Sequence, residues 1–391
     1  MRRQRCAVAT RALRAWVRPQ AAQFSRHPPS THGSQAWGQR LSLLGPGPLK
    51  NLIALATTFC LVAAPPASAR LAAGTGGSGD NAARRAAAMH VTGRWYRPTS
   101  AWNTRIPANP PIAPRSGTLM QAFVTRWCVR AACLGPTMVS VPAVYYASRA
   151  TPLVTVQVNF PSCDAREVRA PIPANALPDG PPEGGMTVMV QKSGVEWDFF
   201  KLTRPGVKPL SSGAVCRATD KWAATVVAKA DPGWRGSGTL KAAPRASGTL
   251  NGSGLIRPRD TRKPPGATWD HAIALAYPGT LAGTHVWPAV RTDGTCGDPD
   301  ACIPLGARLQ LDPSLECSSW PTLVAEWQRQ LCRTLQRYGL IIVDSGSALL
   351  VQNPVSLGSY AYPWIPGWAT LPADLAAHLR VLDWTRWRGA E

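Results

Sequence analysis

The sequence lacks the short motifs that mark several large enzyme classes. It contains no G-x-S-x-G, no Walker loop, no G-x-G-x-x-G between a predicted strand and a helix, and no H-E-x-x-H, which argues against a serine hydrolase, a nucleotide hydrolase, a dehydrogenase and a zinc protease. No C-x-x-C pair occurs, so zinc is a weak explanation for the cysteines. Glycine does not recur at every third position and helix-forming stretches are interrupted, which excludes collagen and coiled coils. The 45% of apolar residues can nevertheless build a core.

Acidic residues are scarce, because 21 Asp+Glu stand against 43 Lys+Arg and give a formal charge of +22. Residues 1–69 hold nine of the Lys+Arg and none of the Asp+Glu, so a chain without this segment carries +13. No cluster of five Lys/Arg is left in 70–391, where the positive charges are scattered. This pattern favours an anionic polymer or surface over nucleic acid as the partner.

A long apolar run is also missing, but a short one lies near the N-terminus. Lys50, the apolar stretch 52–64 and Ala67-Ser68-Ala69 follow the order of a secretory signal with its cleavage site. The run is shorter than the roughly 20 residues that cross a bilayer, so a retained transmembrane helix is the weaker alternative. We expect cleavage after Ala69 and a secreted, extracellular or cell-wall-associated protein. The distance of this signal from Met1 suggests a translation start further downstream; a long basic extension is the alternative.

The domain organisation follows from this signal. We expect residues 1–69 to be a basic extension and signal peptide that is removed, 70–90 to be a flexible Gly/Ala/Ser/Arg linker, and 91–391 to be a single domain. The Pro/Trp-rich tail, 360–387, is expected to wrap the edge of a sheet. We expect the mature protein to be a monomer without a transmembrane segment.

Eight cysteines follow the predicted cleavage site: 128, 133, 163, 216, 296, 302, 317 and 332. An even number in an exported chain indicates disulfides, although the sequence does not choose among the possible pairings. Cys128/Cys133 and Cys296/Cys302 can each close a short loop. Cys317/Cys332 would require the chain before a predicted helix to double back.

Strand-length apolar runs separated by turn residues dominate the rest of the chain. Ten candidates are 138–146, 153–160, 187–191, 195–202, 222–228, 271–277, 285–289, 307–311, 340–343 and 348–351. One amphipathic helix is predicted at about 319–338, with its apolar stripe at 323, 324, 327, 331 and 335. The fold class is therefore mainly β, a β-sandwich or jelly roll with one helix.

Four predicted strands carry polar residues on one face, and these are the candidate catalytic residues: Glu196, Asp198, His271, His285 and Arg308. Alternation places Glu196 and Asp198 on one face, and Arg308 with Gln310 on another. Carboxylates can act as acid and base, Arg and Gln can bind a uronate carboxylate, and Trp can stack on a sugar. We expect Trp287 and Gln310 to bind substrate, and no metal ligands.

Structural explanations stand beside these assignments. A strand histidine is more often a hydrogen-bonded structural residue, Glu196/Asp198 can form a solvated edge, and Arg308 can simply pair with either. Asp293, Asp298 and Asp300 are loosely compatible with Ca²⁺ but lack a regular ligand pattern. Asp344-Ser345-Gly346 is interpreted as a turn rather than as the site of a catalytic acid. No cofactor is expected, with Ca²⁺ as the weak alternative.

A resemblance is carried by an ordered series of segments: 246–248, 254–258, Trp269-Asp270-His271-Ala272-Ile273, Trp287-Pro288-Ala289, 306–311, 335–339 and 344–346. In this series the chain resembles a group of exported, mostly uncharacterised actinobacterial proteins, over roughly 95–355. The resemblance implies secretion and a β-rich fold and leaves the reaction open. Glu196-x-Asp198 is also faintly similar to the Glu-x-Asp-x-x-Glu of laminarinase-like glycoside hydrolases. Lys201 replaces the second Glu, which removes one member of the carboxylate pair of the retaining mechanism.

Three functions remain open at this stage. The first is a secreted enzyme acting on extracellular or cell-wall polysaccharide, of the glycoside hydrolase or polysaccharide lyase type. The second is a non-catalytic jelly-roll protein that binds carbohydrate or cell wall. The third is an exported structural protein without a small ligand.

Overall fold

The computed structural model describes residues 94–127, 132–133, 135–137, 142–179, 184–207, 220–346, 348–350 and 371–386, which belong to one compact unit. The predicted extension, 1–69, and linker, 70–90, lie outside the described residues. Strands dominate and helices are few, so the predicted mainly β fold is confirmed.

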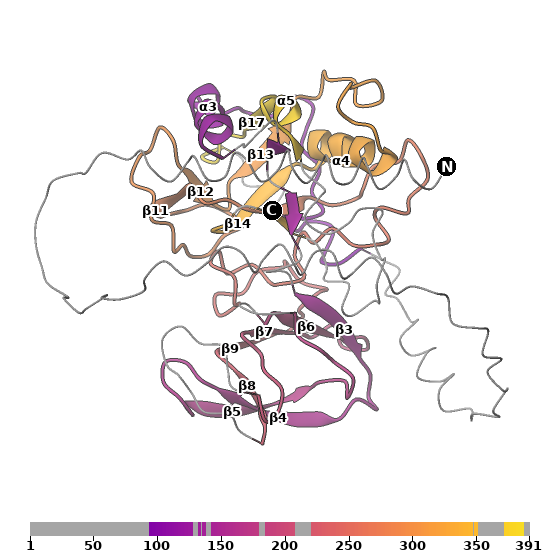
Figure 1. Ribbon diagram of the computed structural model, residues 1–391, viewed down its shortest axis with the longest axis vertical. Helices are drawn as coiled ribbons and strands as arrows, with labels where there is room; N and C mark the ends of the chain where they lie inside the picture. The colour runs from indigo at the N-terminus through magenta and orange to yellow at the C-terminus, as the bar shows by residue number, and fades with distance from the viewer. Residues whose placement is uncertain are drawn as a thin grey trace, which may run out of the picture. The chain divides into compact units, whose positions relative to one another are not determined.

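Two antiparallel-rich sheets face each other in one part of this unit (Figure 1). The first has the order β3 (Ala143–Ala147), β6 (Met186–Val190), β7 (Glu196–Phe200) and β9 (Val226–Ala230), and the second the order β5 (Arg166–Pro171), β4 (Leu153–Val158) and β8 (Trp222–Ala224). Buried side chains of both sheets, among them Val156, Val188 and Phe199, form one hydrophobic cluster. This arrangement is a small β-sandwich.

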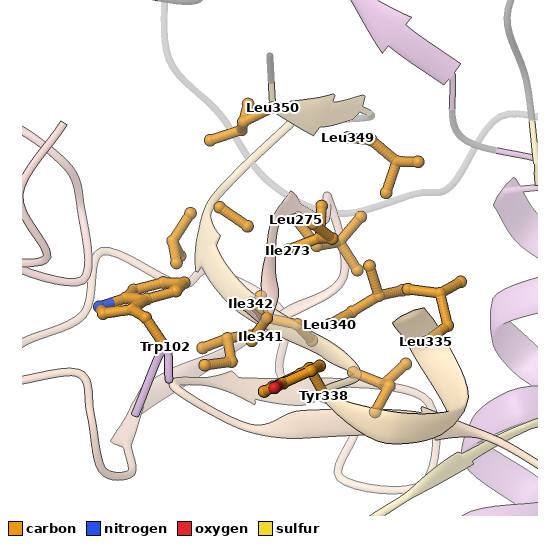
Figure 2. Packing of buried hydrophobic residues seen from close by; sticks show 14 of the residues in the cluster. Trp102, Ile273, Leu275, Leu335, Tyr338, Leu340, Ile341, Ile342, Leu349 and Leu350 are labelled. Carbon is orange, nitrogen blue, oxygen red and sulfur yellow. The ribbon is translucent and has the colours of Figure 1, made fainter. Parts of the chain in front are cut away.

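The larger core surrounds a six-stranded mixed sheet. Its order is β17 (Leu379–Val381), β13 (Arg308–Leu311), β14 (Leu340–Asp344), β10 (Ile273–Ala276), β15 (Ala348–Leu350) and β2 (Gly135–Thr137). The first four residues of β14, and all of β10, are buried, as expected for central strands that are covered on both faces. Figure 2 shows Leu335 and Tyr338 packed beside the apolar side chains of these strands.

Two short strand pairs complete the sheets. They are β1 (Ala132–Cys133) with β16 (Leu371–Pro372), and β11 (Thr280–His285) with β12 (Ile303–Leu305).

Three helices occur among the described residues, where the sequence predicts one: α3 (Ser116–Trp127), α4 (Glu326–Arg337) and α5 (Ala373–Ala376). Helix α4 is the predicted helix, but it begins at Glu326 and not near residue 319. Leu331 and Leu335 are buried as predicted, whereas Val324 precedes the helix and is 78% exposed. No helix in the described ranges has the length and apolar character that a membrane crossing needs.

The late start of α4 allows the Cys317–Cys332 disulfide. The sequence permits this bond only if the chain before the helix doubles back. Residues before the helix double back, so that the Cα atoms of Cys317 and Cys332 lie 5.8 Å apart and the two cysteines are bonded. Trp320 Nε1 and Thr322 Oγ1 donate hydrogen bonds to Asp374, which holds this returning segment against α5.

The other cysteine predictions have mixed outcomes. The disulfide Cys296–Cys302 is confirmed. Cys163 is also disulfide-bonded. The pairing of Cys133 with Cys128 is not tested, because Cys128 lies outside the described residues.

Most predicted strands are confirmed, and the errors have local causes. The strand predicted at 285–289 is wrong, because β11 ends at His285 and a turn follows. Strand β5 and helix α3 are missing from the prediction; Arg166, Glu167 and Arg169 conceal the alternation of β5, which lies at a solvated edge. The described part of the tail, 371–386, supplies β17 as an edge strand of the large sheet.

We expect the Cys317–Cys332 bond to contribute substantially to stability, because it closes a 15-residue separation. The double substitution Cys317→Ser/Cys332→Ala is predicted to lower the free energy of unfolding by about 2–4 kcal/mol. Denaturant titration of the wild type and the variant measures this. An unchanged midpoint would contradict the prediction, and Cys296→Ser/Cys302→Ser, which opens a shorter loop, should cost less.

Candidate functional site

Glu196 and Asp198 lie on the face of β7 that is turned away from the sandwich core. Phe199 belongs to the sandwich cluster and Trp197 packs against it, so alternation directs the two carboxyls to the other face. That face is covered, because Glu196 is 1% exposed and Asp198 is fully buried. The two carboxyls are therefore interior groups and not a solvated edge.

Each carboxyl is held by hydrogen bonds from within the fold. Tyr96 Oη donates to Glu196 Oε2 at 3.0 Å, and the Gly252 N–H donates to Oε1 at 3.1 Å. Asp198 accepts from Thr187 Oγ1 at 2.8 Å and from the Asn251 N–H at 2.7 Å. The pair thus connects β7 with β6, with the segment around Tyr96 and with the loop at residues 251–252.

Burial controls the protonation of this pair. Burial, and then the charge of Asp198, raises the pKa of Glu196 well above its usual range. Burial raises the pKa of Asp198 to about 6, and the two carboxyls interact electrostatically. Two adjacent carboxyls of this kind share a proton more readily than both ionise.

This geometry does not fit glycosidase chemistry. Retaining enzymes hold their carboxyls about 5–5.5 Å apart and inverting enzymes hold them further apart, so that sugar or water fits between them. Glu196 and Asp198 are buried and covered by Tyr96 and Gly252, which leaves them without access for a sugar. A Cβ at Gly252 would lie 2.9 Å from Glu196 Oε1 and 2.8 Å from Tyr96 Oη, so the loop closes tightly over the pair.

Tyr96 is itself held in a strained backbone conformation. Its φ is 69°, which is unusual for a bulky residue. The side-chain amide of Asn103 donates to the carbonyl oxygens of Trp95, Tyr96 and Arg97 at 2.8, 2.9 and 3.1 Å. Asn103 thereby stabilises the turn that directs the Tyr96 hydroxyl onto Glu196.

His271 lies in a different cluster, next to Asp260. Asp260 Oδ2 accepts from Arg257 Nε and is 3.1 Å from His271 Nε2, and the other ring nitrogen lies 2.9 Å from the Ala272 carbonyl oxygen. Although burial alone would raise it, the charges of Arg257 and His271 hold the pKa of Asp260 well below its usual range. Both ring nitrogens face oxygens of the protein, as in a structural histidine.

Arg308 and Gln310 lie on β13 and bind the C-terminal end of α4. Arg308 Nε donates to the Tyr338 carbonyl at 2.9 Å, and Nη2 donates to that of Ala101 at 2.8 Å. Burial lowers the pKa of Arg308 to about 9. Gln310 donates to the Gln336 carbonyl at 2.7 Å. A cation beside helix-terminal carbonyls is stabilising, which gives both residues a structural role.

The remaining predicted residues lie elsewhere. His285 is exposed at the end of β11, and Trp287 is 37% exposed in the following turn. Asp298 and Asp300 lie in the Cys296–Cys302 loop, where Asp300 pairs with Arg115. Within the described ranges, no group of three or more His, Cys, Asp or Glu is arranged to hold a metal.

A cavity of about 770 Å³ lies at the carboxyl ends of two parallel strands. Strands β10 and β14 run parallel and end beside it, at Ala276 and Asp344, a position where ligands commonly bind in α/β sheets. Its volume suits a small ligand. The main polar lining residues are Arg245, Asn251, Arg291, Asp293, Asp344 and Ser345.

The cavity lies next to the carboxyl pair, but neither carboxyl lines it. Asn251, whose N–H binds Asp198, lines the cavity, and so does Phe200 of β7. None of the seven residues predicted from the sequence lines it. Sequence reasoning missed the cavity because its residues come from loops far apart in the chain; Asp344-Ser345-Gly346 was the available signal, and it was interpreted as a turn. The Ser345 N–H does bond Asp344 Oδ1, at 2.9 Å.

In comparisons with protein-family models, curated proteins and solved structures, nothing matches this chain.

We expect the carboxyl pair to make stability fall as the pH rises. Folding raises both pKa values, so between about pH 4 and pH 6 the folded chain binds more protons than the unfolded chain, and the free energy of unfolding decreases with pH. The double variant Glu196→Gln/Asp198→Asn lacks this effect. Relative to the wild type it should gain about 3 kcal/mol between about pH 4 and pH 7.

Denaturant titrations of both proteins across this range provide the measurement. Glu167→Gln, at an exposed residue paired with Lys221, is the control and should show no such gain. A constant difference between the double variant and the wild type would contradict a proton-sharing pair.

Asp260→Asn is predicted to be severely destabilising, because it leaves Arg257 and His271 buried without their carboxylate. The expected loss is about 3–5 kcal/mol in the free energy of unfolding. Asp270→Asn is the matched comparison, since Asp270 is only half-buried, and it should cost clearly less. Equal losses in thermal or denaturant unfolding would rule out a special role for the Asp260 cluster.

Proposed function

We propose that this chain is an exported protein that binds carbohydrate in the cavity beside β10 and β14, without cleaving it. The observation that carries the proposal is the cavity's lining, which combines hydrogen-bond donors and acceptors with the apolar ring of Phe200. Sugars require this combination, because their hydroxyls donate and accept while their C–H faces pack on aromatic rings.

Export is supported by the cysteines. Two disulfides are present among the described residues, and Cys163 is bonded as well. Disulfides persist mainly in oxidising compartments, which agrees with the signal-like segment before residue 70.

Binding is favoured over cleavage because the carboxyl pair with raised pKa values is closed off from the cavity. Glu196 and Asp198 are buried and do not line it. Cleavage of an extracellular polysaccharide is the second candidate, supported by Asp293 and Asp344, two carboxylates of the cavity wall. It would assign acid and base roles to these two residues and not to Glu196 and Asp198.

The test is a panel of polysaccharides and oligosaccharides offered to the full chain, expressed under oxidising conditions. The proposal predicts retention on a subset of the panel, with no reducing ends or unsaturated products released. Asp293→Asn should weaken binding about tenfold, the equivalent of one hydrogen bond to a charged group. Asp300→Asn, a matched change outside the cavity, should leave binding unchanged.

Product release that is abolished by Asp293→Asn would establish the second candidate. Absence of binding to every saccharide would overturn the proposal altogether.

A further inference from the structure

Arg245 is a buried cation on the wall of this cavity. It is 5% exposed, and burial lowers its pKa. Its Nη1 donates to the Ser253 carbonyl at 2.7 Å and its Nη2 to the Asn251 carbonyl at 2.6 Å. Among the described residues no carboxylate is in ion-pair contact with it. These two bonds use only part of a guanidinium that carries five N–H groups.

A buried charge without a counter-charge is costly, and proteins normally pair it. The largest electrostatic compensation comes from Asp344, which makes no ion pair with Arg245. Arg291, the other arginine of the cavity, is engaged differently, since it donates to a series of backbone carbonyls that includes those of Ala243, Arg245 and Ala246. Arg245 is thus the cation of the cavity that is suited to an incoming anion.

Asp293 and Asp344 place the opposite requirement on a ligand, because they are anions. A carboxylate at neutral pH only accepts hydrogen bonds, so a ligand group that contacts Asp293 or Asp344 has to be a donor. Ser345 Oγ lies 3.5 Å from Asp293 Oδ1 and its N–H binds Asp344, which places both acids around one residue. A ligand that satisfies the whole wall carries a carboxylate for Arg245 and hydroxyls for the aspartates.

We infer that the cavity selects an acidic saccharide, a uronate whose carboxylate pairs with the Arg245 guanidinium while its hydroxyls donate to Asp293 and Asp344. This inference rests on the proposed carbohydrate binding and adds the substrate class and the residue that determines it. Bidentate pairing of a carboxylate with a guanidinium is geometrically specific.

The decisive comparison uses one protein and two ligands. Calorimetry of the full wild-type chain with trigalacturonate, and with the same trisaccharide after reduction of its carboxyls to alcohols, should give a preference of about tenfold or more for the acid. The protein is basic, so the titration is repeated at about 0.5 M salt, where attraction between exposed charges is screened. The preference should persist there, because the pair with Arg245 is buried.

Two variants test the role of Arg245 in the preference for the acid. Arg245→Gln should remove the preference for the acid; because Arg245 also holds the carbonyls of 251 and 253, its folding is checked by thermal melting. Asp344→Asn retains an oxygen for the Ser345 N–H and removes the charge that competes with the ligand for Arg245. It should raise the preference for the acid over the reduced trisaccharide several-fold, because both ligands lose a charged acceptor for a hydroxyl and only the acid gains at Arg245.

The possible outcomes distinguish failure of the uronate inference from failure of the proposed carbohydrate binding. Equal binding of both trisaccharides, or a preference that disappears with salt, would overturn the inference and leave carbohydrate binding intact. Acetate or phosphate binding as tightly as trigalacturonate would overturn the assignment to a saccharide. Binding of neither trisaccharide, with other sugars of the panel retained, would refute the inference alone; no retention at all would refute both.

Discussion

The buried carboxyl pair Glu196–Asp198 is the feature on which the arrangement around the cavity depends. It lies on the covered face of β7 and joins that strand to Tyr96 and to the N–H groups of Asn251 and Gly252. The same short loop accepts hydrogen bonds from Arg245. The two acids therefore stabilise one side of the loop, and a buried guanidinium stabilises the other.

This arrangement explains why the polar faces predicted from the sequence do not form one cleft. Glu196, His271 and Arg308 each bind groups of the fold: a loop and a tyrosine, a buried aspartate, and the carbonyls at the end of α4. Polar residues of β7, of β13 and of the segment before β10 are used as internal connections between different parts of the fold. The cavity wall is built mainly by residues outside these connections, such as Arg245 and Asp293.

The strands and the main helix were predictable because they depend on local signals. Runs such as Leu340–Val343 and Leu153–Val158 are apolar, of strand length and bounded by turn residues. The start of α4 was not predictable, since a disulfide and contacts with Asp374 decide it. The site was not predictable either, because alternation shows which face a side chain takes but not whether another part of the chain covers that face.

The central claim is that a sugar binds at Arg245 in the cavity and not at the carboxyl pair. A crystal structure of the full chain with trigalacturonate tests it most directly. The account predicts a carboxylate within hydrogen-bonding distance of the Arg245 guanidinium, with Tyr96 still bonded to Glu196. Density for the sugar against Glu196 and Asp198, with Tyr96 and Gly252 displaced, would contradict it.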